Sequence, residues 1–140
     1  MDFKNFKIFK SIGKEINVKS FGIKVQIIDF DNVRLEHEGV VTFKNLECLV
    51  GQGKDAHWKC YNDMRKVLSE SGDAKDSDDI WKRSNLKTNL IWLKYVSKEL
   101  AKKCKKYNNI FKLIKIDKSC SSCAAYTSSA NFKALCKKLE

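Results

Sequence analysis

The fold of this chain is decided by the stretch from Gly39 to Leu68, GVVTFKNLECLVGQGKDAHWKCYNDMRKVL. Thr42 is a good N-cap for a short first helix, which Gly51 would end in a left-handed C-cap. After that glycine turn a second helix, capped by Asp55, is predicted to run to about Glu70. Two helices joined by a glycine turn form a helix-turn-helix, and this layout predicts contact with nucleic acid.

The predicted second helix has two opposite arcs, because successive residues of a helix are turned by about 100°. The apolar arc, which should pack against the core, contains Trp58, Tyr61, Met64 and Leu68. The polar arc would be free to touch nucleic acid, and its residues are Lys59, Asn62 and Lys66, with Arg65 beside them. Asn62 is the candidate for reading an adenine edge in a major groove.

A small antiparallel sheet is predicted before this stretch. The start of the chain, Phe3 to Ile12, alternates apolar with basic residues, which suits a short edge strand or an amphipathic arm, and both alternatives stay open. A strand is expected to begin near Phe21. Turns at Asp31-Asn32 and at Glu38-Gly39 separate it from two further strands.

A basic wing is predicted after the second helix. The segment from Ser69 to Asp79 is polar and acidic, which indicates a surface loop. The next residues, IWKRSNLKTNLIW from Ile80 to Trp92, suggest a β-hairpin with a basic tip. The tip would present three more contact residues to nucleic acid, namely Lys82, Arg83 and Lys87.

A long amphipathic helix is predicted from Trp92 to Lys106. Its apolar stripe is Leu93, Val96, Leu100 and Cys104, and its polar side is Lys94, Lys98, Lys102 and Lys105. Phe111 to Ile116 could form a closing strand. The tail is serine-rich and ends in a short helix with Phe132, Leu135, Cys136 and Leu139 at core spacing.

The composition favours an anionic partner. The 140 residues suffice for one hydrophobic core, and 28 Lys plus Arg against 17 Asp plus Glu give a formal charge of +11. We find no run of about 18 apolar residues and no signal peptide, so we expect no membrane partner and an intracellular location, in the nucleus or cytoplasm. Lysine outnumbers arginine, which predicts salt-sensitive binding with little direct base reading.

No cofactor and no catalysis are expected. Cys120 and Cys123 form a CxxC pair with Cys136 thirteen residues later, but this set lacks the fourth ligand that zinc requires. The acidic residues Asp29, Asp31, Glu36 and Glu38 could hold a divalent metal for a nuclease. Their positions in turns and at the ends of edge strands, where acidic residues are common, explain them better. The sequence also contains no phosphate-binding glycine loop.

The order of elements resembles the KilA-N and APSES DNA-binding domains. The resemblance runs from about Val25 to Ile116 and is most specific from Trp92 to Ala101, which is similar to the family's tryptophan segment and following helix. It implies a winged-helix-like core that binds DNA in viral or fungal regulators. A SAND domain is the competitor, on the residues from Thr42 to Glu47, from Gly51 to Lys54 and from His57 to Lys59, and it also implies DNA binding.

The sequence therefore predicts an α+β fold, with a small antiparallel sheet, a helix-turn-helix-like centre and a helical tail. Residues 1–20 would form an arm, residues 21–116 the DNA-binding domain, and residues 117–140 the Cys/Ser-rich tail. The predicted function is non-catalytic binding of duplex DNA, with RNA as an alternative. A protein-interaction module for an acidic partner is the hypothesis from a different class, and the oligomeric state stays open.

Overall fold

The computed structural model describes residues 5–8, 16–19, 26, 28–51, 55–70, 72–105, 108–111 and 114–138. The chain divides into two compact units, Met1–Phe30 and Asp31–Glu140, each of which is described by itself below. The predicted division into residues 1–20, 21–116 and 117–140 stays a prediction. Among the described residues no helix combines the length and the apolar character needed to cross a membrane.

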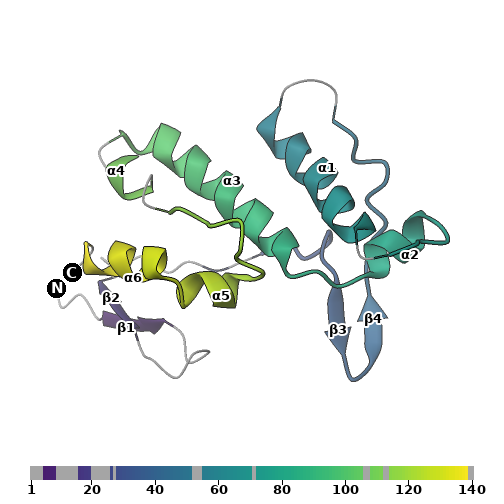
Figure 1. Ribbon diagram of the computed structural model, residues 1–140, viewed down its shortest axis with the longest axis horizontal. Helices are drawn as coiled ribbons and strands as arrows, with labels where there is room; N and C mark the ends of the chain where they lie inside the picture. Colours follow the sequence, from purple (N-terminus) through teal and green to yellow (C-terminus); the bar gives the residue numbers. More distant parts are fainter. Residues whose placement is uncertain are drawn as a thin grey trace. The chain divides into compact units, whose positions relative to one another are not determined.

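The first unit contains an antiparallel pair of strands, β1 (Asn5–Ile8) and β2 (Ile16–Lys19), drawn in purple in Figure 1. The start of the chain therefore forms a strand, one of the two alternatives left open above. Most of the strand predicted from Phe21 onward lies outside the described residues. Gln26 and residues 28–30, which are described, are not in a strand.

The second unit begins with the predicted hairpin. Strand β3 (Leu35–His37) pairs with β4 (Val40–Thr42), and His37 lies opposite Val40. The two-residue connection puts both Glu38 and Gly39 at positive φ, 50° and 78°. A type I′ turn requires positive φ at both central residues, and it matches the twist of the two strands. The turn predicted from the Glu-Gly pair is thus confirmed.

The predicted first helix is wrong. Thr42 ends strand β4 instead of capping a helix, and residues 43–51 form an irregular segment with one turn, closed by the bond from Leu49 N–H to the Leu46 carbonyl. A helix this short is marginal in isolation, so tertiary contacts decide the conformation. Here Leu46 is buried at 3% exposure, its carbonyl accepts a hydrogen bond from Arg65 of the next helix, and the neighbouring Asn45 donates its amide to Ser77 Oγ.

The predicted second helix is confirmed as α1 (Ala56–Ser69). Its N-cap is Asp55, whose carboxylate accepts a hydrogen bond from His57 N–H. Gly51 does not end a helix; a Cβ placed on it would lie 2.0 Å from the Cβ of Trp58, so only glycine fits there. The apolar arc packs as predicted, since Tyr61 and Leu68 are buried and the other two members lie against the core.

The predicted wing is wrong, because its residues form helices. Helix α2 (Ser77–Lys82) starts inside the expected loop, and α3 (Lys87–Lys103) starts five residues before Trp92. The side chain of Asp76 caps α2 by accepting from Asp79 N–H, and two acids lie in its first turn, where the helix dipole favours them. These local signals, with Trp81 buried against the core, outweigh the turn-forming centre of the segment.

The apolar stripe predicted for α3 is only partly correct. Leu90 and Ser97 are buried, whereas Val96 and Leu100 are 46% and 39% exposed. The predicted closing strand is wrong in its described part: Phe111 ends α4 (Asn108–Phe111), and residues 114–116 form no strand.

The tail forms two short helices, α5 (Cys123–Thr127) and α6 (Ala130–Lys137). The helix expected at the end of the chain is confirmed as α6, with Leu135 buried, while Leu139 lies outside the described residues.

The core of the second unit lies where α1, α2 and the irregular segment meet. Its buried members are Leu46, Tyr61, Leu68 and Trp81. Partly buried Phe43, Leu49, Trp58, Met64, Ile80 and Trp92 pack around them. Helix α3 packs along α1, as Figure 1 shows. The helix-turn-helix-like fold class stays a prediction. Two of the elements predicted for it, the first helix and the β-hairpin wing, do not form in the described residues.

Candidate functional site

The polar arc of α1 is exposed as predicted, but most of its charge is engaged within the protein. Lys59 Nζ lies 2.7 Å from Asp63 Oδ1, in an ion pair one helical turn apart. The side-chain oxygen of Asn62 accepts a hydrogen bond from Arg65 at 3.0 Å. Lys66 is exposed and forms no ion pair with any described residue. Of the three predicted contact residues, Lys66 alone presents a free charge.

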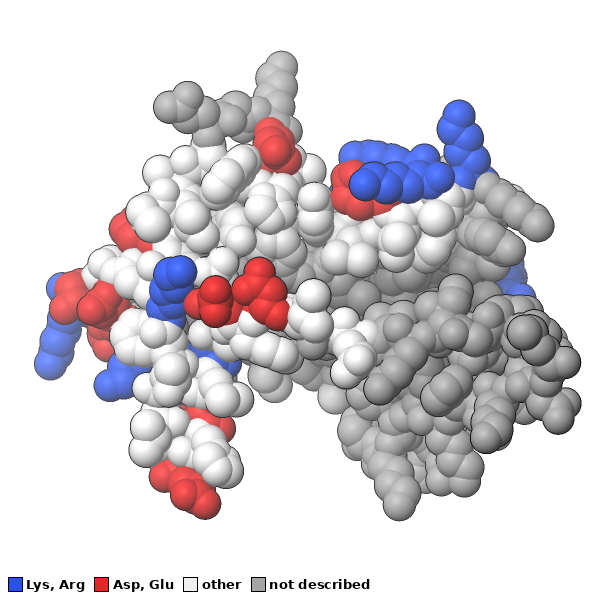
Figure 2. Space-filling view, turned by 180° about the vertical axis from the view of Figure 1, so that it is seen from behind, with Lys and Arg blue, Asp and Glu red and all other residues white. Residues whose placement is uncertain are grey.

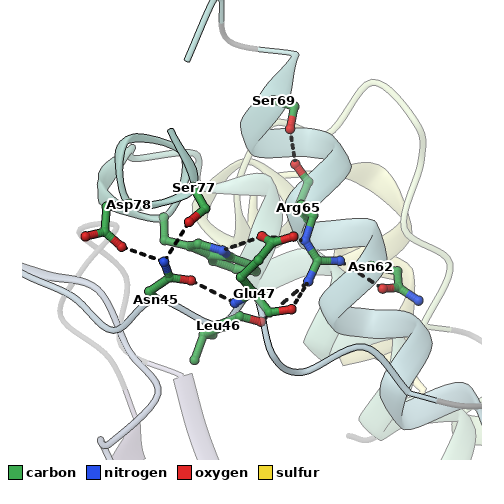
Figure 3. Close-up of polar contacts among 9 residues, drawn as sticks. Asn45, Leu46, Glu47, Asn62, Arg65, Ser69, Ser77 and Asp78 are labelled. Atoms are coloured by element: carbon green, nitrogen blue, oxygen red, sulfur yellow. Dashed lines mark hydrogen bonds and ion pairs between the residues drawn. The ribbon is translucent and has the colours of Figure 1, made fainter. Parts of the chain in front are cut away.

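Arg65, which was predicted to contact nucleic acid, instead holds the irregular segment onto α1 (Figure 3). Its Nε donates to Glu47 Oε2 at 3.1 Å, and its second amino group donates to the carbonyls of Leu46 and Glu47. The guanidinium also stacks over the ring of Trp81, 5.5 Å from its centroid. The side chain is 19% exposed. Arg65 is therefore a structural residue.

Asn45 extends the same contact to α2. Its amide donates to Ser77 Oγ at 2.8 Å and to the carboxylate of Asp78, while its oxygen accepts from Glu47 N–H. Figure 3 shows Asn45 facing the first turn of α2, while Arg65 reaches from α1 to the other side of Glu47. The irregular segment is thus fastened on both sides by polar side chains.

The three residues predicted at the wing tip are not gathered together. Arg83 C-caps α2, and its guanidinium donates to the carbonyls of Leu68, Gly72 and Asp73 and meets Asp79 at 3.5 Å. Lys82 is the last residue of α2, and its carbonyl accepts a 2.6 Å bond from Arg34 Nε. Lys87 is the first residue of α3. No basic tip exists in this segment.

Two of the four acidic residues considered above have positive φ: Glu38, where the β3–β4 turn requires it, and Asp29, which lies outside any hairpin turn. Asp29 has φ of 64°, in the left-handed region where few residues other than glycine occur. Such strain collects at ligand-binding positions, and Asp is one of the residue types that tolerate it. Asp29, Ile28 and Phe30 are all exposed, the last two at 79% and 62%. A carboxylate held in this conformation at the surface is a candidate ligand for a cation.

The cysteines are free and do not form a zinc site. Within the described ranges no group of three His, Cys, Asp or Glu side chains could hold a metal ion. Cys120, Cys123 and Cys136 are all partly buried and lie in or beside α5 and α6. Burial raises the pKa of Cys123, which keeps its thiol protonated.

Comparison with known proteins identifies the family. The family model for the haspin-like kinase domain matches residues 6–138, nearly the whole length, so the chain belongs to the haspin-like kinase domain family. The serine/threonine-protein kinase haspin of Bos taurus is 28% identical over 92 residues, covering 63% of this chain and 10% of that protein. That of Mus musculus is 28% identical over 97 residues, covering 66% and 12%.

The likeness extends to plants but covers a small part of each relative. The serine/threonine-protein kinase haspin homolog of Arabidopsis thaliana is 28% identical over 88 residues, covering 60% of this chain and 13% of that protein. The chain thus spans about a tenth of the length of these curated relatives. No solved structure matches it.

These comparisons overturn the predicted identity and function. The KilA-N and APSES resemblance and the SAND alternative are wrong, and so are the viral and transcriptional roles they implied. Non-catalytic DNA binding is wrong as the function, and the expectation that no enzyme is involved is wrong too. Helical spacing, a glycine turn and excess lysine occur in many folds, and the segment read as a wing is helical.

The pair Asp29-Phe30 is a possible kinase motif that the predictions above did not include. Protein kinases carry an Asp-Phe-Gly signature whose aspartate binds Mg²⁺. Asp29-Phe30 matches its first two positions and follows the apolar residues Ile27 and Ile28, while Asp31 stands in place of the glycine. Above, Asp29 is considered only as part of a nuclease metal site. The Asp-Phe pair after an apolar run is the sequence signal that makes Asp29 a candidate for this position.

Proposed function

We propose that this chain takes part in phosphoryl transfer from ATP to a serine or threonine hydroxyl, and that Asp29 is its metal-binding residue. The family and the names of the relatives support the reaction class. The observation that supports the residue is the left-handed backbone of Asp29 within the Asp-Phe pair.

The donor chemistry at Asp29 suits magnesium. Mg²⁺ prefers oxygen ligands and is commonly bound by one or two carboxylates together with substrate phosphates and water. One exposed carboxylate therefore fits, even though the described residues contain no group of three potential ligands. A bound Mg²⁺ would supply positive charge against the negative charge that develops on the phosphates during transfer. Asp29 would hold it through its carboxylate oxygens.

Other parts of the kinase signature do not occur in these 140 residues. The sequence contains no His-Arg-Asp, no Val-Ala-Ile-Lys and no Gly-x-Gly-x-x-Gly. Those parts supply the catalytic base and the residues that hold the phosphates. The proposal for this chain is accordingly confined to the binding of the metal and its nucleotide.

Titration of the chain with Mn²⁺ and ATP, followed by electron paramagnetic resonance of free Mn²⁺, tests this proposal. Removing a carboxylate ligand should weaken binding strongly, so Asp29→Asn is expected to reduce the affinity for the Mn²⁺–ATP complex by about tenfold or more. Asp31→Asn is the matched control, with the same charge change two residues away, and should stay within about twofold of the unaltered chain.

Two results would contradict the proposal. Equal losses in the two variants would mean that the effect is one of general charge. Unchanged affinity in Asp29→Asn would remove Asp29 from the metal site.

A location inside the cell, and specifically in the nucleus, is proposed as well. The reaction class supports the location inside the cell, because ATP is an intracellular substrate. DNA as a partner is a separate proposal, supported by lysines on α3 and not by the arc of α1 that the sequence favoured. RNA stays the alternative.

A further inference from the structure

Helix α3 presents a row of lysines on one side. Lys94, Lys98 and Lys102 are spaced four residues apart and are exposed. On an α-helix that spacing places them within about 80° of one another, with successive residues rising by about 6 Å. We name these three residues the lysine arc. In Figure 2, basic side chains gather over the C-terminal end of α3, around an acidic side chain.

The charges of the lysine arc are less neutralised than those of α1. Glu99 is the one acid in α3, and it pairs with Lys102 at 2.6 Å. The hydrogen bond that Lys102 donates to Glu99 raises the pKa of this lysine, which stays charged. In the described part of the chain, neither Lys94 nor Lys98 has an ion-pair partner. Lys59 on α1 is paired with Asp63.

The position of the lysine arc favours a nucleic acid over a membrane. A helix that lies on a membrane buries an apolar face, with lysines on the polar face around it. The exposed apolar residues of α3, Val96 and Leu100, lie more than about 100° from the centre of the lysine arc. Contact through this arc would therefore be made by charge alone, as it is with a phosphate backbone.

We propose that the lysine arc of α3 is a docking surface for the phosphate backbone of a nucleic acid. Lys94 and Lys98 contact phosphates as point charges, and Lys102 adds a weaker third contact because Glu99 shares its charge. The binding is not specific for sequence, since no side chain that reads bases lies within the arc. Binding through the lysine arc requires neither the carboxylate of Asp29 nor ATP.

Fluorescence anisotropy with labelled duplex DNA, without nucleotide or metal, tests the proposal. Lys94→Gln with Lys98→Gln is expected to reduce affinity by about tenfold at low salt, and to lower the slope of log affinity against log salt by about 1.8, or 0.9 per lost contact. The matched control is Lys133→Gln with Lys137→Gln, which removes the same charge from exposed residues of α6. It should have less than half of this effect.

Several outcomes would overturn the proposal. Equal losses in the two variant pairs would mean attraction by net charge alone. Salt-insensitive binding, or no binding by the unaltered chain to duplex DNA or to a labelled RNA of equal length, would also contradict it. The same would follow if vesicles containing anionic lipid bound the chain more tightly than either nucleic acid. Since all four lysines are exposed, circular dichroism should show that both variants keep the helical content of the unaltered chain.

Discussion

Arg65 connects three parts of the second unit through one guanidinium group. It lies on α1, donates to Glu47 and Leu46 of the irregular segment, and covers the ring of Trp81 on α2. A guanidinium has five donors in a fixed plane, so it can satisfy a carboxylate and backbone carbonyls together. The side chain replaces the backbone hydrogen bonds that a helix over residues 43–50 would have supplied.

Arg65→Met should lower the free energy of unfolding by about 1–3 kcal/mol, because Glu47 and two carbonyls lose a charged donor. Lys66→Met is the control, since Lys66 is exposed and unpaired among the described residues, and should change it by about 0.5 kcal/mol or less. Urea denaturation followed by tryptophan fluorescence measures both. Similar values for the two variants would show that the contacts of Arg65 add no stability.

Tyr126 has a buried hydroxyl group that forms no hydrogen bond with any described residue. The residue is 3% exposed. Its ring meets Phe132 edge to face, with the centroids 5.6 Å apart. Burial, and secondarily the nearby thiols of Cys120 and Cys136, raise its pKa above the usual value.

Tyr126→Phe should leave the free energy of unfolding unchanged or raise it by about 1 kcal/mol, since an unsatisfied hydroxyl is removed from the interior. A raised pKa in the folded state means that the unfolded chain loses this proton first as the pH rises. The unaltered protein therefore loses stability above about pH 10, the usual tyrosine value, and the variant should lose less. Urea midpoints at pH 7 and pH 10.5 test this. A loss of more than about 1 kcal/mol at pH 7 would mean that the hydroxyl has a partner.

At the scale of elements, two glycines serve different purposes. Gly39 supplies the positive φ that the β3–β4 turn requires, and an added Cβ there would meet nothing within 4 Å. Gly51 is required by packing, because an added Cβ would overlap the Cβ and Cγ of Trp58 at 2.0 Å. The first requirement is local and can be read from the Glu-Gly pair, whereas the second depends on a neighbour seven residues away.

Gly51→Ala should therefore cost more stability than Gly39→Ala. The overlap with Trp58 requires α1 or the irregular segment to move, at a cost of about 2–3 kcal/mol, whereas backbone strain at Gly39 costs about 1 kcal/mol. Thermal unfolding followed by circular dichroism ranks the two variants. A smaller cost at Gly51 would show that the segment shifts freely.

Cap chemistry and helical period made α1 predictable. The N-cap Asp55 directly precedes α1, and the residues of the apolar arc lie within it. A short window of sequence therefore contains everything needed to predict this helix. The residues read as a wing contain turn formers and apolar ends, and such a pattern fits either a hairpin or two helices. The cap at Asp76 and the burial of Trp81 resolve this in favour of helices, and the second of these depends on residues far away in the sequence.

At the scale of the whole molecule, excess charge indicated an anionic partner but could not indicate which surface it binds. Charge is useful for binding only where it is free, and Lys59, Arg65 and Arg83 are all engaged within the protein. Lys94 and Lys98 are not engaged in the described part of the chain. The proposed docking surface thus moves from α1 to α3. The family is identified by similarity over residues 6–138, nearly the whole chain. No single short motif identified it.

The sequence by itself determined the Glu-Gly turn of the β3–β4 hairpin, helix α1 with its cap and apolar arc, and the helix near the end of the chain. Each depends on interactions between residues a few positions apart, and backbone geometry determines these. Only the tertiary structure decided the irregular conformation of residues 43–51 and the structural use of Arg65 and Arg83. These features depend on partners 10 to 19 residues away, at distances set by packing and not by local pattern.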